Sequence, residues 1–226
     1  MARSVIVTGG FGVLGQAVAQ AFAAQGDKVA RVDFVASAPI ALAGALDVGG
    51  VDLTDAAATQ AALDKVAAAH GGIDVLVNIA GGFTWETLEG GSLESWARMQ
   101  SMNLMSAVTI TKLALPHLKS AKEGRIVNIG AGAAVKAAMG MGAYTASKSG
   151  VHRLTEALAE ELAGTGVTVN AILPSIIDTP TNRADMPDAD FAQWVQPAAI
   201  ADVIRFLASS AARGVTGALI PVTRPA

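Results

Sequence analysis

The chain contains no cysteine among its 226 residues. Disulfide bonds, thiolate metal sites and cysteine nucleophiles are therefore all excluded. Histidine is scarce as well, and the three present, His70, His117 and His152, lie far apart in the sequence. We therefore expect no zinc site and predict that the protein binds no metal.

Charged residues are also few, at 15% of the chain, and the formal net charge is −3 with a pI near 5.6. No run of lysine or arginine marks a surface for nucleic acid or for an anionic membrane, so neither partner is expected. No apolar run approaches the roughly 18 residues that a membrane span needs, and the first residues, MARSVIVTGG, leave no room for a signal peptide's apolar core. We therefore expect a cytoplasmic protein.

Hydrophobic residues make up 52% of the chain, so one large core can form, and we predict a single domain over residues 1–226. Short β-branched runs alternate with helical patterns along the whole chain. This alternation predicts an α/β fold, a Rossmann-like doubly wound sheet of seven parallel strands with helices on both faces. The expected strands are residues 4–8, 28–32, 47–53, 73–78, 125–129, 167–173 and 218–222.

Helical patterns separate the expected strands, and a polar segment at residues 182–194 has the composition of a lid. Asn103 falls in the middle of the third helical pattern, where a buried amide side chain needs hydrogen-bond partners. The expected helices are residues 13–25, 54–70, 92–120, 143–163 and 197–209.

Three glycines follow the first expected strand at three-residue intervals in the sequence TGGFGVLG: Gly9, Gly12 and Gly15. A strand, a glycine turn and a helix in this order let backbone amides approach a pyrophosphate and place it at a helix N-terminus. The alternative is merely a tight turn between a strand and a helix. The context favours a dinucleotide site, to which Val13 and Leu14 would also belong.

An acidic residue, Asp33, ends the second strand 18 residues after Gly15. Its carboxylate can accept hydrogen bonds from both hydroxyls of an adenosine ribose, whereas the 2′-phosphate of NADP would face a like charge. The nearby basic residue of the strand, Arg31, is expected to point to the opposite face of the sheet from a neighbour one residue away. We therefore predict NAD(H) as the cofactor, with NADP(H) less favoured; alternatively, Asp33 only caps the next turn.

Further cofactor contacts are expected at the carboxyl ends of later strands, because parallel sheets bind ligands there. Asp52 and Leu53 would stand beside the adenine. The small residues Ala80 and Gly81 would let a cofactor pass closely, although a tight turn would also need them.

Tyr144 is the only tyrosine in the chain, and Lys148 follows it by four residues. In a helix the two share a face, so the ammonium of Lys148 would lie beside the phenol. A neighbouring cation favours the phenolate and lowers the pKa of tyrosine from its usual value of ~10. The pair could equally be an ordinary polar contact on a helix surface. Together with the upstream cofactor motif, it indicates an acid/base centre.

These motifs jointly resemble the short-chain dehydrogenase/reductase family over nearly the whole chain. The resemblance implies that Tyr144 transfers the proton and that Lys148 lowers its pKa and binds the nicotinamide ribose. It implies that Asn103 supports a proton-relay water, that Pro174 and Thr179 lie at the nicotinamide, and that the protein is a homodimer or homotetramer. The matching segments are TGGFGVLG, Asp33, Asp52-Leu53, NIAG at 78–81, Asn103, YTASK at 144–148 and VNAILPSIIDTP at 169–180.

Three features depart from the usual pattern of the family. The glycine turn is spaced G-x-x-G-x-x-G, and Ile79 stands where a second asparagine is usual. Ala131 stands 13 residues before Tyr144, where the family has a serine that hydrogen-bonds the substrate carbonyl. No Ser or Thr between residues 130 and 143 replaces it.

The chain is similar in these departures to one branch of the family, the dihydropteridine reductases. The aromatic Phe83 after AGG and the run LPSIIDTPTNRADMPDADFAQW at residues 173–194 are similar as well. Phe83 and Trp85 could stack on a planar substrate beside Ala131, although loop aromatics more often cover core.

The resemblance implies an oxidoreductase that prefers NADH and reduces a quinonoid dihydropteridine-like small molecule, with Tyr144 as proton donor. A quinonoid pterin is already electron-poor, whereas a ketone would lose about 10²–10³ in rate without an oxyanion donor. The second hypothesis is a general carbonyl or alcohol dehydrogenase, with a water or a backbone amide near Gly132 replacing the serine. The third is a catalytically silent NAD-binding redox sensor, which the intact Tyr144–Lys148 pair disfavours.

Overall fold

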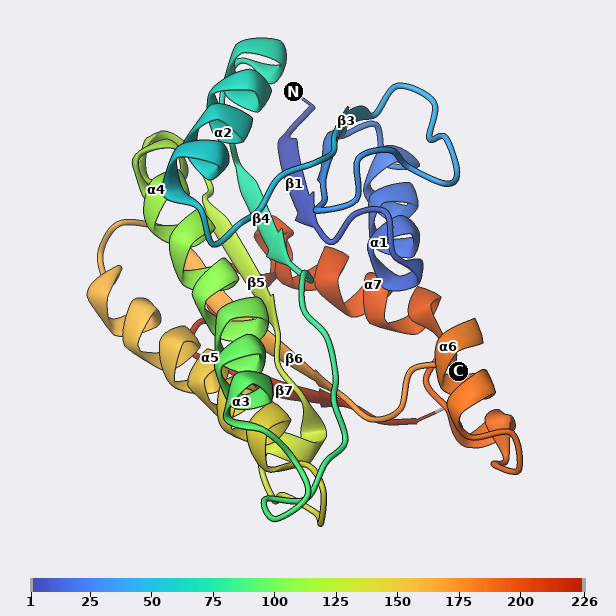
Figure 1. Ribbon diagram of the computed structural model, residues 1–226. Helices are drawn as coiled ribbons and strands as arrows, with labels where there is room; N and C mark the ends of the chain where they lie inside the picture. Colours follow the sequence, from blue (N-terminus) through green and yellow to red (C-terminus); the bar gives the residue numbers. More distant parts are fainter. Residues whose placement is uncertain (1, 225–226) are drawn as a thin grey trace.

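A computed structural model describes residues 2–224. Its seven strands form one parallel sheet in the order β3-β2-β1-β4-β5-β6-β7 (Figure 1). The predicted fold class is therefore confirmed. The strands are β1 (Ser4–Thr8), β2 (Lys28–Val32), β3 (Leu46–Val48), β4 (Val75–Asn78), β5 (Arg125–Ile129), β6 (Thr168–Pro174) and β7 (Leu219–Val222).

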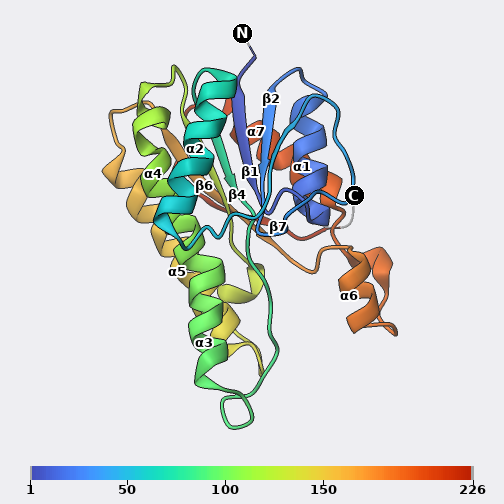
Figure 2. The ribbon, with the colours of Figure 1, turned by 45° about the horizontal axis from the view of Figure 1, so that its top comes forward.

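Helices cover both faces of this sheet (Figures 1 and 2). One face packs against α1 (Val13–Ala23) and α7 (Pro197–Leu207), and the other against α2 (Ala56–His70), α4 (Ser106–Ser120) and α5 (Gly142–Glu161). Successive strand side chains point to opposite faces. In β1, Val5 and Val7 therefore join the core under α1 and α7, and Ile6 joins the core on the other face. No helix within residues 2–224 is long and apolar enough to cross a membrane.

The third strand is shorter than the sequence predicts, because β3 ends at Val48 and does not continue to residue 53. Gly49 and Gly50 follow, and Gly50 has a φ of 74°, a left-handed conformation that leaves the extended path of a strand. The backbone N–H of Val51 then donates to the carbonyl of Asp33 at 3.0 Å. Asp52 and Leu53 therefore lie in a loop, still at the carboxyl end of the sheet.

The single helix expected at residues 92–120 is divided into three segments: α3 (Leu93–Met99), a π-helical turn (Gln100–Met105) and α4. Asn103 lies in the π-helical turn. Such turns carry one extra residue per turn and occur frequently at functional sites. Hydrophobic periodicity does not mark this change, because the buried positions before α4 include the polar residues Ser95 and Asn103.

The lid-like segment at residues 182–194 is not continuous coil. It contains most of α6 (Pro180–Asp185) and a short 3₁₀ turn (Phe191–Gln193). α6 and α3 stand on opposite sides of the carboxyl ends of the strands, and the loop after β4 runs between them (Figure 2). The remaining helix and strand boundaries lie within two residues of those expected from the sequence.

Candidate active site

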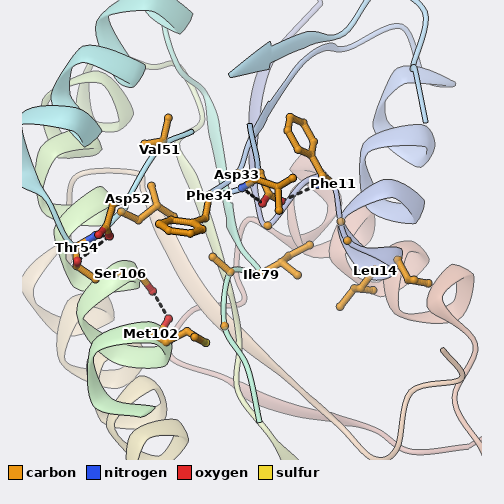
Figure 3. Close-up of a pocket in the computed structure, with 18 of the residues that line it drawn as sticks. Phe11, Leu14, Asp33, Phe34, Val51, Asp52, Thr54, Ile79, Met102 and Ser106 are labelled. Carbon is orange, nitrogen blue, oxygen red and sulfur yellow. Dashed lines mark hydrogen bonds between the residues drawn. The ribbon is translucent and has the colours of Figure 1, made fainter. Parts of the chain in front are cut away.

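A cavity of about 830 Å³ opens at the carboxyl ends of the strands, where the strand order reverses between β1 and β4 (Figure 3). Parallel doubly wound sheets bind ligands at this point. Its wall includes most of the predicted cofactor residues: Gly9, Gly12, Val13, Leu14, Gly15, Asp33, Asp52, Leu53, Ala80, Gly81 and Thr179. Tyr144, Lys148 and Pro174 are not part of this wall.

The glycine turn has the close packing that a pyrophosphate cradle requires. Gly9 has a φ of 62°, and a Cβ on Gly15 would collide with the carbonyl oxygen of Gly9. α1 follows with Gly12 at its N-cap and no side-chain cap, so its first amides are free for a ligand. These residues therefore fit the phosphates of a dinucleotide.

The loop after β4 passes directly over the end of β1. The backbone N–H groups of Ile79 and Ala80 donate to Thr8 Oγ1 at 3.0 and 3.1 Å. A Cβ on Gly9 would lie 3.0 Å from the backbone nitrogen of Ala80. Small residues are needed here for backbone packing as well as for room at the cavity.

Asp33 lines the end of the cavity where the sequence predicts the adenosine, and it also caps two turns. Its Oδ2 accepts from the backbone N–H of Phe11 at 2.9 Å, and its Oδ1 accepts from that of Val35 at 3.0 Å. Figure 3 shows it between Phe11 and Phe34. Each carboxylate oxygen can accept a second bond, so capping leaves room for ribose hydroxyls.

Arg31 and its strand neighbour Val32 point to opposite faces of β2, since successive strand residues alternate. Val32 joins the core under α2 and α4, whereas the stem of Arg31 lies against Gly10 of the glycine turn. Arg31 does not reach the cavity, because its guanidinium is buried and pairs with Asp47 of β3 at 2.7 Å.

Tyr144 and Lys148 lie one helical turn apart near the start of α5. The ring of Phe83 meets the ring of Tyr144 edge-on, with the centroids 4.9 Å apart and an interplanar angle of 80°. Lys148 is buried, and its Nζ donates to the carbonyl of Ile129 at 2.7 Å. A Cβ on Gly81 would lie 3.5 Å from this nitrogen, so Lys148 stands directly behind the cavity wall.

Burial disfavours the charged forms of both members of this pair. Burial raises the pKa of Tyr144 to about 12 and lowers the pKa of Lys148 to about 8. Burial therefore opposes the lowering of the tyrosine pKa that the sequence predicts, because desolvation penalises both charged forms. At neutral pH the phenol keeps its proton, as a proton donor must.

Asn103 ties the loop after β4 to α5. Its Oδ1 accepts from the backbone N–H of Gly82 at 2.9 Å, and its Nδ2 donates to the Gly82 carbonyl at 3.1 Å. The same Nδ2 donates to Ser147 Oγ at 3.0 Å, and Ser147 precedes Lys148. The π-helical turn thereby places a polar side chain beside the predicted acid/base pair.

Ala131 is buried, with 4% of its surface exposed, and a histidine that the sequence motifs did not single out lies behind it. The backbone N–H of Ala131 donates to His152 Nε2 at 3.3 Å. Burial lowers the pKa of His152, with a smaller contribution from the charges of Arg153 and Lys148, so the ring is neutral and can accept this bond. The four-residue spacing from Lys148 to His152 in the sequence indicates that the histidine lies on the same face of the helix as the lysine.

The two loop aromatics occupy different positions. Phe83 is 52% exposed and lies against Tyr144. Trp85 packs on Gly140, where a Cβ would collide with the indole, and the backbone N–H of Glu86 donates to the Gly140 carbonyl at 2.8 Å. Phe83 is therefore at the site, whereas Trp85 holds the loop after β4 against the segment before α5.

Thr179 reaches the cavity from the far side, at the start of α6. Its Oγ1 accepts from the backbone N–H of Asn182 at 3.2 Å and caps the helix. Pro174 ends β6 and is buried, and the segment from it to Thr179 leads to α6. Within residues 2–224, no three His, Asp or Glu side chains gather as metal ligands.

A family model described as short chain dehydrogenase matches residues 3–190. The chain belongs to this family. It is therefore an oxidoreductase of a family that uses nicotinamide cofactors, and the resemblance noted in the sequence is confirmed at this level. A solved structure of aldohexose dehydrogenase from Thermoplasma acidophilum has a TM-score of 0.90 and 28% identity, over 98% of this chain and 92% of that one.

Similar curated proteins include several named dehydrogenases and reductases. D-threitol dehydrogenase of Mycolicibacterium smegmatis is 37% identical, over 96% of this chain and 89% of its own. Meso-2,3-butanediol dehydrogenase of Serratia marcescens is 32% identical, over 97% and 92%. The 3-oxoacyl-[acyl-carrier-protein] reductase MabA of Mycobacterium tuberculosis is 34% identical, over 98% and 92%. These three are named for a polyol, a diol and an oxoacyl group, and none for a pterin.

Proposed function

We propose that the protein is an NADH-preferring reductase in which Tyr144 donates a proton to a planar, electron-poor substrate of the quinonoid dihydropteridine type. The surroundings of Ala131 carry this proposal. The side chain has no hydroxyl, and its backbone N–H is already used by His152. The position that polarises a carbonyl in the family therefore has no donor from this residue, which favours a substrate that needs little polarisation.

The chain's own groups have distinct roles in this proposal. A bound nicotinamide would supply the hydride. Tyr144 holds a proton at Oη, because burial keeps its pKa at about 12, and releases it as charge develops on the substrate. Lys148, in its charged form, stabilises the phenolate that remains. The carbonyl of Ile129 accepts a hydrogen bond from the lysine, and Asn103 donates to Ser147, the residue before it.

Phe83 supports the choice of a planar substrate. Its ring is half-exposed and is held edge-on to Tyr144, so one of its faces can pack against a flat ring placed near the phenol. Trp85 contributes by fixing the loop that carries Phe83.

Asp33 and the Arg31–Asp47 pair support NADH over NADPH. Asp33 places a carboxylate at the adenosine end of the cavity, where a 2′-phosphate would be repelled. Arg31 is the nearby cation of β2, and its charge is already matched by Asp47.

A general carbonyl or alcohol dehydrogenase is the second candidate, and the named relatives favour it. In that case a water or a backbone amide near Gly132 would take the place of the missing hydroxyl. The two candidates differ in the substrate and share the fold, the cofactor and the proton donor.

Steady-state NADH oxidation separates these candidates. The substrates would be quinonoid dihydropterin, generated in the assay, and a panel containing acetoin and a 3-oxoacyl thioester, with NAD⁺ plus threitol for the reverse direction. We expect kcat/KM for the pterin to exceed that for any ketone by about 10²-fold, the value of one oxyanion donor. Faster turnover of a ketone would favour the second candidate. No turnover of either class by a protein that binds NADH would favour a redox sensor.

A further inference from the structure

Arg31 is the most completely buried charged side chain near the cofactor cavity, with 1% of its surface exposed. Its Nε and Nη2 donate to the two carboxylate oxygens of Asp47, each at 2.7 Å. Its Nη1 donates to the carbonyl of Ile40 at 3.0 Å. All three contacts lie on segments outside β2, so the guanidinium joins this strand to β3 and to the loop between them.

The same side chain supports the glycine turn. Its guanidinium carbon lies 5.4 Å from the centre of the Phe11 ring, within reach of a cation–π contact. A Cβ on Gly10 would lie 2.6 Å from the Cβ of Arg31, so the turn passes directly over the arginine stem. Phe11 in turn donates its backbone N–H to Asp33. Arg31 therefore lies beneath the residues that shape the adenosine end of the cavity.

The loop that Arg31 holds through Ile40 also lines this end. Phe34, Val35, Ser37 and Pro39 of the loop form part of the cavity wall. Phe34 is 74% exposed and lies across Asp33 from Phe11 (Figure 3). The glycine turn and the loop after β2, which form the two walls of the adenosine site, thus both contact the buried guanidinium of Arg31.

We propose that Arg31, held by Asp47, is a positioning residue for the adenosine half of the coenzyme site. It fixes the distance between the glycine turn and the loop at residues 34–45, and so preorganises the carboxylate of Asp33. This role extends the proposed function and rests on its nicotinamide cofactor. Small displacements of positioning groups can cost large factors in affinity or rate.

The chain offers a control pair at the opposite end of the sheet, whose arginine side chain is 27% exposed against 1% for Arg31. Arg3 donates from Nε and Nη2 to the carboxylate of Asp27, at 3.3 and 2.7 Å, and from Nη1 to the carbonyl of Ala208. Its guanidinium carbon lies 5.8 Å from the centre of the Phe22 ring. It therefore has the same kinds of contact as Arg31, and neither Arg3 nor Asp27 lines the cofactor cavity.

The test compares Arg31→Met, Asp47→Asn, the double variant Arg31→Met/Asp47→Asn and the control Arg3→Met/Asp27→Asn. The full-length protein is titrated with NADH, NADPH and ADP-ribose, and Tm is measured for each variant. We expect Arg31→Met to raise the Kd of NADH about 10- to 100-fold, and that of ADP-ribose by a similar factor. The kcat at saturating NADH should stay within about twofold, because Tyr144 is untouched.

The double variant separates positioning from stability. Asp47→Asn alone leaves a buried cation without its carboxylate, and removing the arginine as well relieves that cost. We expect the double variant to recover Tm relative to Asp47→Asn and to retain the weak NADH binding. The control variant should lower Tm and leave the Kd of NADH within about twofold, because its contacts are far from the cavity.

Three results would overturn the proposal. The first is an NADH Kd for Arg31→Met equal to that of the native protein, and the second is affinity that returns together with Tm in the double variant. The third is an equal loss of affinity in the Arg3→Met/Asp27→Asn control. A native protein that binds neither NADH nor NADPH would instead contradict the proposed function itself, and with it this role.

Discussion

The proposed coenzyme end and the proposed substrate end of the site are built from different kinds of contact. The coenzyme end uses backbone groups and strand ends: the turn of Gly9 to Gly15 and the carboxylate of Asp33, which binds two amides. The substrate end uses side chains that meet from separate elements, with Tyr144 against Phe83 and Asn103 against Ser147. The first can be read from local sequence, whereas the second depends on tertiary packing.

The largest expected effect is a loss of turnover from a substitution at the substrate end alone. Tyr144→Phe removes the proton donor and keeps the ring against Phe83, so kcat should fall by about 10²–10⁴-fold. The Kd of NADH should remain within about twofold, because Tyr144 is not part of the cavity wall at the coenzyme end. Steady-state rates and fluorescence titration with NADH measure the two quantities. Turnover at the native level would remove Tyr144 from the mechanism.

A change at Asp33 should have the converse effect on the coenzyme end. Asp33→Ala removes the carboxylate and its two amide contacts, so the KM of NADH should rise by about tenfold. Discrimination against NADPH should relax, because the like charge facing a 2′-phosphate is gone. Asp33→Asn is the matched control, since it removes the charge but keeps an acceptor oxygen. A native protein that already prefers NADPH would show that Asp33 has been assigned the wrong role.

A smaller effect is expected for Lys148, whose buried ammonium changes the stability of the fold and the pH dependence of that stability. Below pH ~8 the lysine is charged in both the folded and unfolded states, and its desolvation cost is fully present. Between about pH 8 and 10.5 only the unfolded chain keeps the proton, so the contribution of this residue to stability rises with pH.

Lys148→Met should therefore raise the free energy of unfolding at pH 7 by about 1–3 kcal/mol and abolish this rise with pH, at the expense of turnover. Denaturant unfolding at pH 7 and pH 9.5 measures the free energy of unfolding at both pH values. The control is the substitution of the exposed Lys112 by Met. A loss of stability in Lys148→Met at pH 7 would mean that the bond to Ile129 outweighs desolvation.

Local sequence predicted most of the fold because its determinants are local. β1, the glycine turn and Asp33 follow one another within one β-α-β unit, and the four-residue spacing placed Lys148 beside Tyr144 on α5. The family resemblance then added Asn103 and Thr179.

The remaining features depend on which distant segments pack together. The bond between His152 and Ala131 needs the register of α5 on β5, and the Arg31–Asp47 pair needs that of β2 on β3. The high pKa of Tyr144 follows from burial, which a four-residue spacing cannot report. The π-helical turn at Asn103 adjoins buried positions that are largely polar, such as Ser95, so hydrophobic periodicity does not mark it.

In the proposed function, Ala131 supplies no hydrogen-bond donor to the substrate, so the site suits an activated substrate. The most direct measurement is the ratio of kcat/KM for quinonoid dihydropterin to that for acetoin, in the native protein and in Ala131→Ser. We expect a ratio of about 10² or more in the native protein, falling at least about tenfold in the serine variant as ketone reduction improves. A native ratio below 1, or a ratio unchanged by the serine, would contradict the account.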